Sequence, residues 1–190
     1  MPDALARLRL HAEMAQALAV EELAGQVEEA AAALAERFAA GGRLLLFGNG
    51  GSAADAQHVA AELTGRYLLE RAPLPAIALA DNTAAVSAIA NDYGFDQVFA
   101  RQVAAHGRAG DAAVALSTSG SSPNVLEGLR AARGAGLWTL GVTGPHGEPM
   151  RPLCDELIVV PAGDTPHIQE GTMLVLHTIC ELVEERLFGG

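Results

Sequence analysis

The chain has 190 residues, of which half are hydrophobic and 18% are charged, and its formal net charge at pH 7 is −11. This length suffices for one domain with a substantial core, and the excess of acidic residues excludes an extended nucleic-acid-binding surface. No apolar run approaches the roughly 20 residues needed to span a bilayer, and the acidic, helix-like N-terminal stretch differs from a secretory signal. We therefore expect one cytoplasmic domain over residues 1–190 that binds neither nucleic acid nor membrane.

The two cysteines, Cys154 and Cys180, provide neither a disulfide framework nor a C-x-x-C metal motif. We expect both to be reduced and partly buried thiols.

Residues 3–40 are rich in Ala, Leu, Glu and Gln, and their apolar residues recur near helical spacing. This pattern predicts helix with at most one break, ended by Gly41 and Gly42. So long a helical region carries more apolar surface than one small sheet can cover, so we expect it to pack against another subunit. Residues 1–40 are thus predicted to serve oligomerisation, and residues 41–190 to form an α/β core.

Five continuous apolar runs of strand length follow, separated by helix-like segments. They cover residues 44–47, 76–80, 112–116, 139–142 and 157–160. Continuous apolar strands that alternate with helices are typical of a parallel sheet covered on both faces. We therefore predict a three-layer α/β/α sandwich with five parallel strands, in which ligands bind beyond the carboxyl ends of the strands.

Two short polar motifs fall where a predicted strand ends and a helix begins: GNGGS at 48–52 and STSGSS at 117–122. The backbone N–H groups of a first helical turn have no helical partner and favour an anion. Glycines allow a ligand to approach the backbone, and clustered hydroxyls donate hydrogen bonds to phosphate oxygens. Together the two motifs indicate a sugar-phosphate site.

Each motif has an alternative interpretation. Gly48, Gly50 and Ala53 also satisfy a loose dinucleotide fingerprint with Glu70 as its acidic residue, but Glu70 precedes the second predicted strand instead of ending it. In the second motif, Ser122 ahead of Pro123 is a good helix N-cap. Capping leaves the preceding hydroxyls unused, so phosphate binding is favoured.

His58 and Glu62 share one face of the helix that follows the first motif. Gln169, Met173 and His177 are spaced in the same way on the C-terminal helix. A surface His–Glu pair and a buried core histidine are the simplest interpretations of these residues. Two nitrogens, a carboxylate and an amide oxygen on two helices nevertheless form a plausible site for zinc.

The strings GNGGS at 48–52, HVAAELTGRY at 58–67, AND at 90–92, STSG at 117–120 and IQE at 168–170 closely resemble the phosphoheptose isomerase family. The resemblance covers nearly the whole chain, including the N-terminal helices. It implies the sugar-isomerase (SIS) fold and a homotetramer with active sites at subunit contacts and one zinc ion in each site.

Carried over residue by residue, the resemblance implies zinc ligands at His58, Glu62, Gln169 and His177, of which Glu62 and His177 also form the acid/base pair. The implied substrate contacts are Asn49, Gly50, Gly51, Ser52, Glu62, Arg66, Asn91, Asp92, Ser117, Thr118, Ser119, Ser122 and Gln169. Some family members have an acidic residue where this chain has Pro166. Any assisting role of that carboxylate is therefore absent here or has moved, with Asp164 as the candidate.

The resemblance implies an isomerase that converts sedoheptulose 7-phosphate to D-glycero-D-manno-heptose 7-phosphate through a cis-enediol, a precursor step for lipopolysaccharide or capsule. A carboxylate and an imidazole suit the proton transfers that this reaction requires. Two alternatives stay open: a non-catalytic relative of the same fold that binds the replication initiator, and an isomerase of another phosphosugar. The presence of both Glu62 and His177 favours the enzyme over the binding protein.

Overall fold

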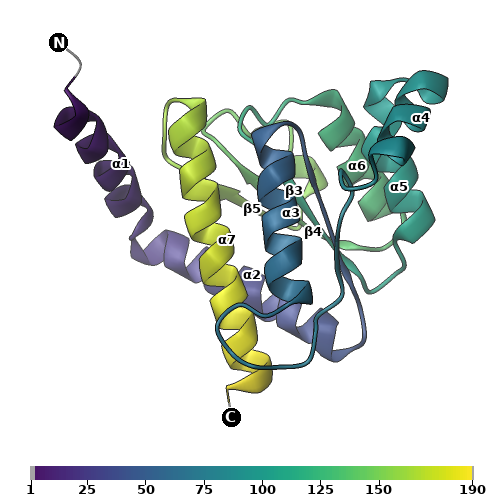
Figure 1. Cartoon of the computed structure of the whole chain (residues 1–190), viewed down its shortest axis with the longest axis horizontal. Coiled ribbons are helices and arrows are strands. Elements are labelled where there is room, and N and C mark those ends of the chain that lie inside the picture. Colours follow the sequence, from purple (N-terminus) through teal and green to yellow (C-terminus); the bar gives the residue numbers. More distant parts are fainter. Residues whose placement is uncertain (1–2, 190) are drawn as a thin grey trace.

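The computed structural model describes residues 3–189, so residues 1, 2 and 190 of the predicted domain lie outside it. Five parallel strands form one sheet in the order β2-β1-β3-β4-β5 (Figure 1). The strands are β1 (Leu44–Gly48), β2 (Ala76–Ala78), β3 (Ala112–Ser117), β4 (Trp138–Thr143) and β5 (Glu156–Val159). All five predicted runs are confirmed as strands, although β2 ends two residues earlier than its apolar run.

Seven α-helices accompany the sheet in the described part of the chain. They are α1 (Ala4–Leu18), α2 (Glu21–Ala39), α3 (Gly51–Thr64), α4 (Thr83–Tyr93), α5 (Val98–His106), α6 (Pro123–Gly134) and α7 (Thr165–Phe188), with short 3-10 turns at Phe95–Gln97 and Arg151–Leu153. The predicted N-terminal helix does break once, between Leu18 and Glu21. Asp3 caps its start through the backbone N–H groups of Leu5 and Ala6.

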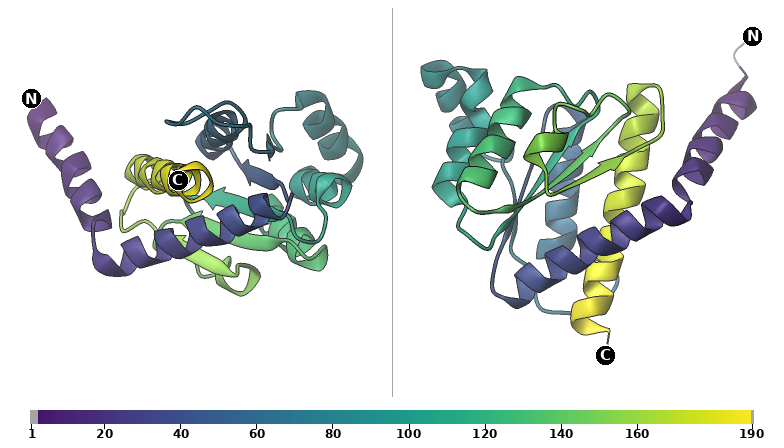
Figure 2. Two further views of the ribbon diagram at one scale, coloured as in Figure 1. Left: turned by 90° about the horizontal axis from the view of Figure 1, so that it is seen from below. Right: turned by 180° about the vertical axis from the view of Figure 1, so that it is seen from behind.

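The central strands β1, β3 and β4 are buried on both faces, as continuous apolar strands predict, whereas the edge strands β2 and β5 are partly exposed. Alternate residues of a strand point to opposite faces, so Leu44 and Leu46 pack under α2, α3 and α7, whereas Leu45 and Phe47 pack under α5 and α6. The three-layer α/β/α architecture is therefore confirmed (Figures 1 and 2).

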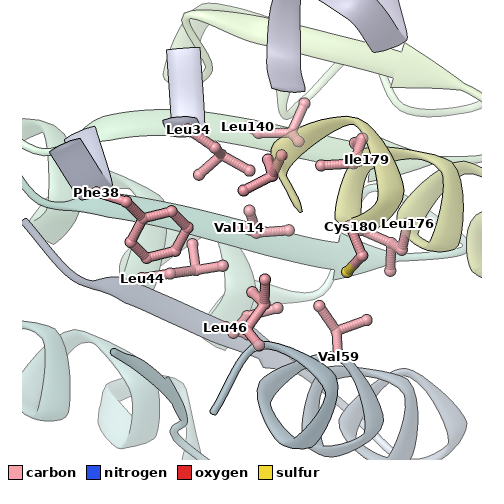
Figure 3. Close-up of a pocket in the computed structure, with 12 residues that line it drawn as sticks. Leu34, Phe38, Leu44, Leu46, Val59, Val114, Leu140, Leu176, Ile179 and Cys180 are labelled. Carbon is pink, nitrogen blue, oxygen red and sulfur yellow. The ribbon is translucent and has the colours of Figure 1, made fainter. Parts of the chain in front are cut away.

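Apolar side chains of the sheet and of helices α2, α3 and α7 point toward one another in the core between them (Figure 3). A small void among them, of about 10 Å³, is lined by apolar side chains and Cys180. A void of this size and polarity favours neither a water molecule nor a ligand. Cys154 and Cys180 are free thiols, and burial raises the pKa of each to about 12, so neither is a ready nucleophile.

The N-terminal half of α1 projects away from the body of the molecule, its Met14 and Leu18 are buried in the core beside α7, and α2 lies against α7 and β5 of the same chain (Figure 2). Val27, Ala30 and Leu34 of α2 are buried in the core. On α1, by contrast, Leu5 and Leu8 are more than half exposed. None of the helices within residues 3–189 combines the length and hydropathy needed to cross a bilayer.

The strand order creates a switch point between β1 and β3. These strands are hydrogen-bonded neighbours, yet the helix after β1 covers one face of the sheet and the helix after β3 covers the other. At such a point the two connections diverge and leave a crevice at the carboxyl edge of the sheet. The GNGGS and STSGSS motifs flank this crevice.

Candidate active site

The two motif loops are joined by a reciprocal pair of amide hydrogen bonds. Asn49 Nδ2 donates to Asn124 Oδ1 and Asn124 Nδ2 donates to Asn49 Oδ1, each over 2.8 Å. Asn124 is buried in the first turn of α6, so its amide needs these partners. The pair holds the glycine loop and the serine loop in a single arrangement across the crevice.

The serine loop closes on itself ahead of α6. Ser117 Oγ accepts a hydrogen bond from the backbone N–H of Gly120 and lies 3.4 Å from Ser122 Oγ and 3.5 Å from Ser119 Oγ. Gly120 has a φ of 66°, which favours glycine. The loop therefore presents several hydroxyls beside the N-terminal end of α6, where the helix dipole favours an anion.

Ser122 occupies the N-cap position of α6 and Pro123 follows it, as the sequence predicts. The hydroxyl of Ser122, however, makes no capping hydrogen bond to the helix backbone. The capping interpretation of this side chain is thus wrong, because the hydroxyl turns toward Ser117 instead.

The glycine loop is shaped around Gln169 of α7. Gly50 has a φ of 56° and precedes α3 at its N-cap. A Cβ added at Gly51 would lie 2.3 Å from Gln169 Nε2 and 2.5 Å from its Oε1, so the amide of Gln169 occupies the space that a side chain at Gly51 would need. The family resemblance implies that Gly51 contacts the substrate. The structure adds that the Gln169 amide occupies the space that Gly51 leaves open because it has no side chain.

Asp55 lies one turn further along α3 and also contacts Gln169, whose Nε2 donates to Asp55 Oδ1 over 3.4 Å. The other carboxylate oxygen, Oδ2, is buried and has no hydrogen-bond partner. Burial raises the pKa of Asp55, while the hydrogen bond from Gln169 and the nearby His58 act in the opposite direction. An unpaired buried acceptor beside Gln169 and His58 is consistent with a site that binds a cation or a donor group.

Helices α3 and α7 run side by side and bring three of the four predicted zinc ligands together (Figure 1). His58 Nε2 lies 2.9 Å from His177 Nε2 and 3.5 Å from Glu62 Oε1. Neighbouring ligands of tetrahedral zinc are about 3.3 Å apart, given Zn–N distances of about 2.0 Å. The donor types are those that zinc prefers, and the 2.9 Å contact between the two ring nitrogens is of hydrogen-bond length.

These donors do not form a closed cage. Within residues 3–189, no three His, Cys, Asp or Glu side chains are arranged as a ready metal centre, so the side chains must reorient to surround an ion. Gln169 and His177 share an open groove of about 560 Å³ with Asp55 and Met173. The groove lies between α1 and α7, since His11, Met14 and Ala15 of α1 line its other side.

Three predicted substrate residues lie apart from these contacts. Arg66 follows the C-terminal end of α3, is exposed and pairs with Glu70. Asn91 donates to the carboxylate of Asp92 near the end of α4, and in the described part of the chain neither residue bonds to the two motif loops. Glu70 is almost fully exposed ahead of β2, so the structure gives no support to the dinucleotide interpretation.

Asp164, the candidate for the role of the carboxylate that Pro166 lacks, makes local contacts at the start of α7. It is the N-cap of α7, where its Oδ1 accepts from the backbone N–H of His167 and contacts the His167 ring. These hydrogen bonds lower the pKa of Asp164. Pro166 stands in the first turn of α7, a position that proline favours.

The sequence predictions missed Asn124, Asp55 and Tyr67. The ring of Tyr67 lies 5.5 Å from the ring of His177 between centroids. Tyr67 is the last residue of the HVAAELTGRY string, and Asp55 lies three residues before it. Asn124 directly follows Pro123, and a polar side chain at the start of this helix could have been predicted to contact the loop. Each side chain acquires its role through a partner distant in sequence.

The fold and the two loops define a SIS domain, and the family model of that domain matches residues 11–144. The chain belongs to the phosphoheptose isomerase family. It is 54% identical over 166 residues to a phosphoheptose isomerase of Rhodospirillum rubrum, covering 87% of this chain and 88% of that one. It is 50% identical to that of Geobacter sulfurreducens, covering 98% of each chain.

A solved structure supports the same assignment. The phosphoheptose isomerase of Neisseria gonorrhoeae superposes with a TM-score of 0.88 at 39% sequence identity, covering 95% of this chain and 96% of that chain. The similarity extends over the whole architecture, N-terminal helices included.

Proposed function

We propose that the protein is an aldose–ketose isomerase that converts sedoheptulose 7-phosphate to D-glycero-D-manno-heptose 7-phosphate, the first step of nucleotide-heptose biosynthesis. One observation carries the proposal: α3 and α7 bring Glu62 and His177 to the same cluster around His58. The reaction needs two groups that exchange protons at adjacent atoms, and a carboxylate and an imidazole meet that need.

The serine loop holds the phosphate in this proposal. The hydroxyls of Ser117, Thr118, Ser119 and Ser122 and the N-terminus of α6 offer hydrogen bonds to its oxygens. A net charge of −11 repels an anionic substrate at long range, so binding depends on these local donors. Asn49, Gly50, Gly51, Ser52 and Gln169 border the crevice in which the sugar chain then lies.

Glu62 removes the proton from the carbon next to the carbonyl and returns it to the neighbouring carbon. His177 moves the second proton between the two oxygens, which yields the cis-enediol and then the aldose. No electron is gained or lost overall, since hydrogen only changes place within the substrate. Arg66, Asn91 and Asp92 are proposed to contact the substrate when it is bound.

A zinc ion, one per subunit, is proposed to be held by His58, Glu62, Gln169 and His177. When bound, it stabilises negative charge on the enediolate oxygens. An atom that donates its lone pair to a metal cannot accept a proton at the same time. We therefore propose that Glu62 and His177 are weak ligands that exchange roles as the substrate enters.

The assembly is proposed to be a cytoplasmic homotetramer with active sites at subunit contacts. The exposed leucines of α1 support this, because an apolar helix face that projects from the body is typical of an interface. Residues 1–40 would thus serve assembly through α1, while α2 also contributes to the core of its own chain.

The test is turnover of sedoheptulose 7-phosphate by the purified protein, compared with Glu62→Gln. The variant keeps the shape of Glu62 but cannot accept the proton, so turnover should fall by roughly 10²–10⁴-fold while substrate still binds. Exchange of the substrate carbon hydrogen with heavy water should be lost in parallel. Glu36→Gln, which changes an exposed carboxylate near the C-terminal end of α2, is the matched control.

Wild-type turnover by Glu62→Gln would disprove this mechanism. Absence of turnover in the unmodified protein would instead favour another phosphosugar or a non-catalytic binding role. A panel of ketose phosphates of different chain lengths then separates these two alternatives.

A further inference from the structure

Arg71 and Glu184 form an ion pair in the interior of the protein. Arg71 Nε lies 2.7 Å from Glu184 Oε1, and the two side chains are 0% and 1% exposed. Removing two charges from water is costly, and apolar residues of similar size often stabilise a fold equally well. The stability of the core alone therefore does not explain why the pair is here.

Glu184 holds the segment that follows α3. Its two carboxylate oxygens accept hydrogen bonds from the backbone N–H groups of Tyr67, Leu68 and Leu69 over 2.8–2.9 Å. Burial by itself raises the pKa of Glu184, but these donors and Arg71 lower it to about 2. The carboxylate is therefore charged and fully hydrogen-bonded at neutral pH.

Arg71 holds the end of α3 itself. Its guanidinium donates to the carbonyl oxygens of Glu62 and Leu63 over 2.9 and 2.8 Å. Carbonyl groups in the last turn of a helix have no helical partner, so the guanidinium completes this end of α3. The ion pair thus joins the C-terminal turns of α3 and α7, around which the segment after α3 passes in Figure 1.

The segment that Glu184 anchors places one ring against the histidine pair. Tyr67 is half-buried, and its ring lies 5.5 Å from that of His177 at an interplanar angle of 30°. Glu184 is seven residues after His177 on α7, and a separation of two helical turns puts both on one face. The backbone of Tyr67 is thus fixed to the same helix face that carries His177.

We propose that Arg71, Glu184 and Tyr67 are positioning residues that hold the imidazole of His177 and the carboxylate-bearing turn of Glu62 in their working arrangement. The effect on kcat that we expect from these residues rests on the proposed isomerase function. In the structure, the ring of Tyr67 lies against one side of His177. The ion pair holds this ring in place, because Glu184 binds the backbone N–H of Tyr67.

The kinetic test compares Tyr67→Phe with Tyr67→Leu. The ring contacts His177 and no hydrogen bond from the phenol hydroxyl is seen within residues 3–189, so Tyr67→Phe should keep most of kcat. Tyr67→Leu should lower kcat by roughly 10- to 100-fold with little change in KM, since the loss concerns orientation of the reacting groups. Equal activity of the wild type and Tyr67→Leu would overturn the proposal.

Glu184→Gln tests the ion pair, with Glu185→Gln as the control on the adjacent, exposed position. Fluorine NMR of 3-fluorotyrosine protein should show two signals, from Tyr67 and Tyr93, which Tyr67→Phe assigns. Glu184→Gln should shift or broaden only the Tyr67 signal, should speed hydrogen exchange over residues 67–69, and should lower kcat. Glu185→Gln should change none of these.

The spectroscopic readout does not depend on the reaction. If the protein does not isomerise sedoheptulose 7-phosphate, an unshifted Tyr67 signal in both His177→Gln and folded Glu184→Gln still refutes the positioning proposal. A shifted signal in both variants supports it, whatever the substrate is.

Discussion

The Nε2 atoms of His58 and His177 lie 2.9 Å apart, although 119 residues separate them in the chain. Each histidine belongs to a helix that packs on the same face of the sheet, and Glu62 adds a carboxylate oxygen 3.5 Å from the first of them. This contact brings side chains of α3 and α7 together in one polar cluster.

The first prediction concerns zinc. The purified protein should contain about one zinc per chain, and His58→Ala should lower the occupancy because it removes a nitrogen donor. Elemental analysis measures this, with His106→Ala, on α5 of the opposite face, as the control. Fully active protein without zinc would remove the metal from the mechanism.

The second prediction concerns the phosphate. Ser119→Ala should weaken substrate binding by ~1–3 kcal/mol, the range for a lost hydrogen bond to a charged group. Steady-state kinetics should show a raised KM with a smaller change in kcat. An unaltered KM would indicate that the serine loop is only structural.

The third prediction concerns the space beside Gly51 that the Gln169 amide occupies. A methyl group at Gly51 would lie 2.3 Å from Gln169 Nε2, so Gly51→Ala should displace this amide and lower both zinc occupancy and kcat. The matched control is Gly25→Ala in α2, where an added Cβ meets nothing within 4 Å. That variant should keep full activity and gain about 0.5–1 kcal/mol of stability from helix propensity. Equal activity of the two variants would show that activity does not depend on the position of the Gln169 amide beside Gly51.

The fourth prediction concerns acid stability. The pKa of Glu184 is lowered from 4.5 to about 2, so its ionised form stabilises the folded state above about pH 4.5, and this contribution is lost as the pH falls toward 2. The shift corresponds to about 3 kcal/mol. Urea unfolding between pH 2 and 7 should show a steeper acid loss for the wild type than for Glu184→Gln. Parallel pH curves would show that Glu184 does not contribute.

The fifth prediction concerns assembly. Removing residues 1–20 deletes the exposed leucines of α1 together with the buried Met14 and Leu18, and should convert the proposed tetramer into a folded, smaller and less stable species. Removing residues 1–40 also deletes Val27 and Leu34 from the core, so this version should unfold or aggregate. Light scattering and circular dichroism distinguish the outcomes. A stable tetramer without residues 1–20 would exclude α1 from the interface.

The sequence by itself was sufficient for the architecture and for the location of the two loops. Each strand is a continuous apolar run, because a parallel sheet buried on both faces requires apolar residues at successive positions. The glycines and hydroxyls of the loops are local signals too, and they stand directly after strands β1 and β3. Helical spacing likewise placed His58 with Glu62, and Gln169 with His177, before any tertiary contact was considered.

Only the tertiary structure decided how these local elements combine. Three contacts join residues that are 75 to 118 positions apart. They are the hydrogen bonds between Asn49 and Asn124, the packing of Gln169 on Gly51 and the buried ion pair of Arg71 with Glu184. Periodicity shows which face of a helix is buried, but it does not show which turn of one helix lies beside which turn of another. That register is set by the packing of α3 and α7 on the sheet, where side chains from distant segments must fill one volume and satisfy each other's hydrogen bonds.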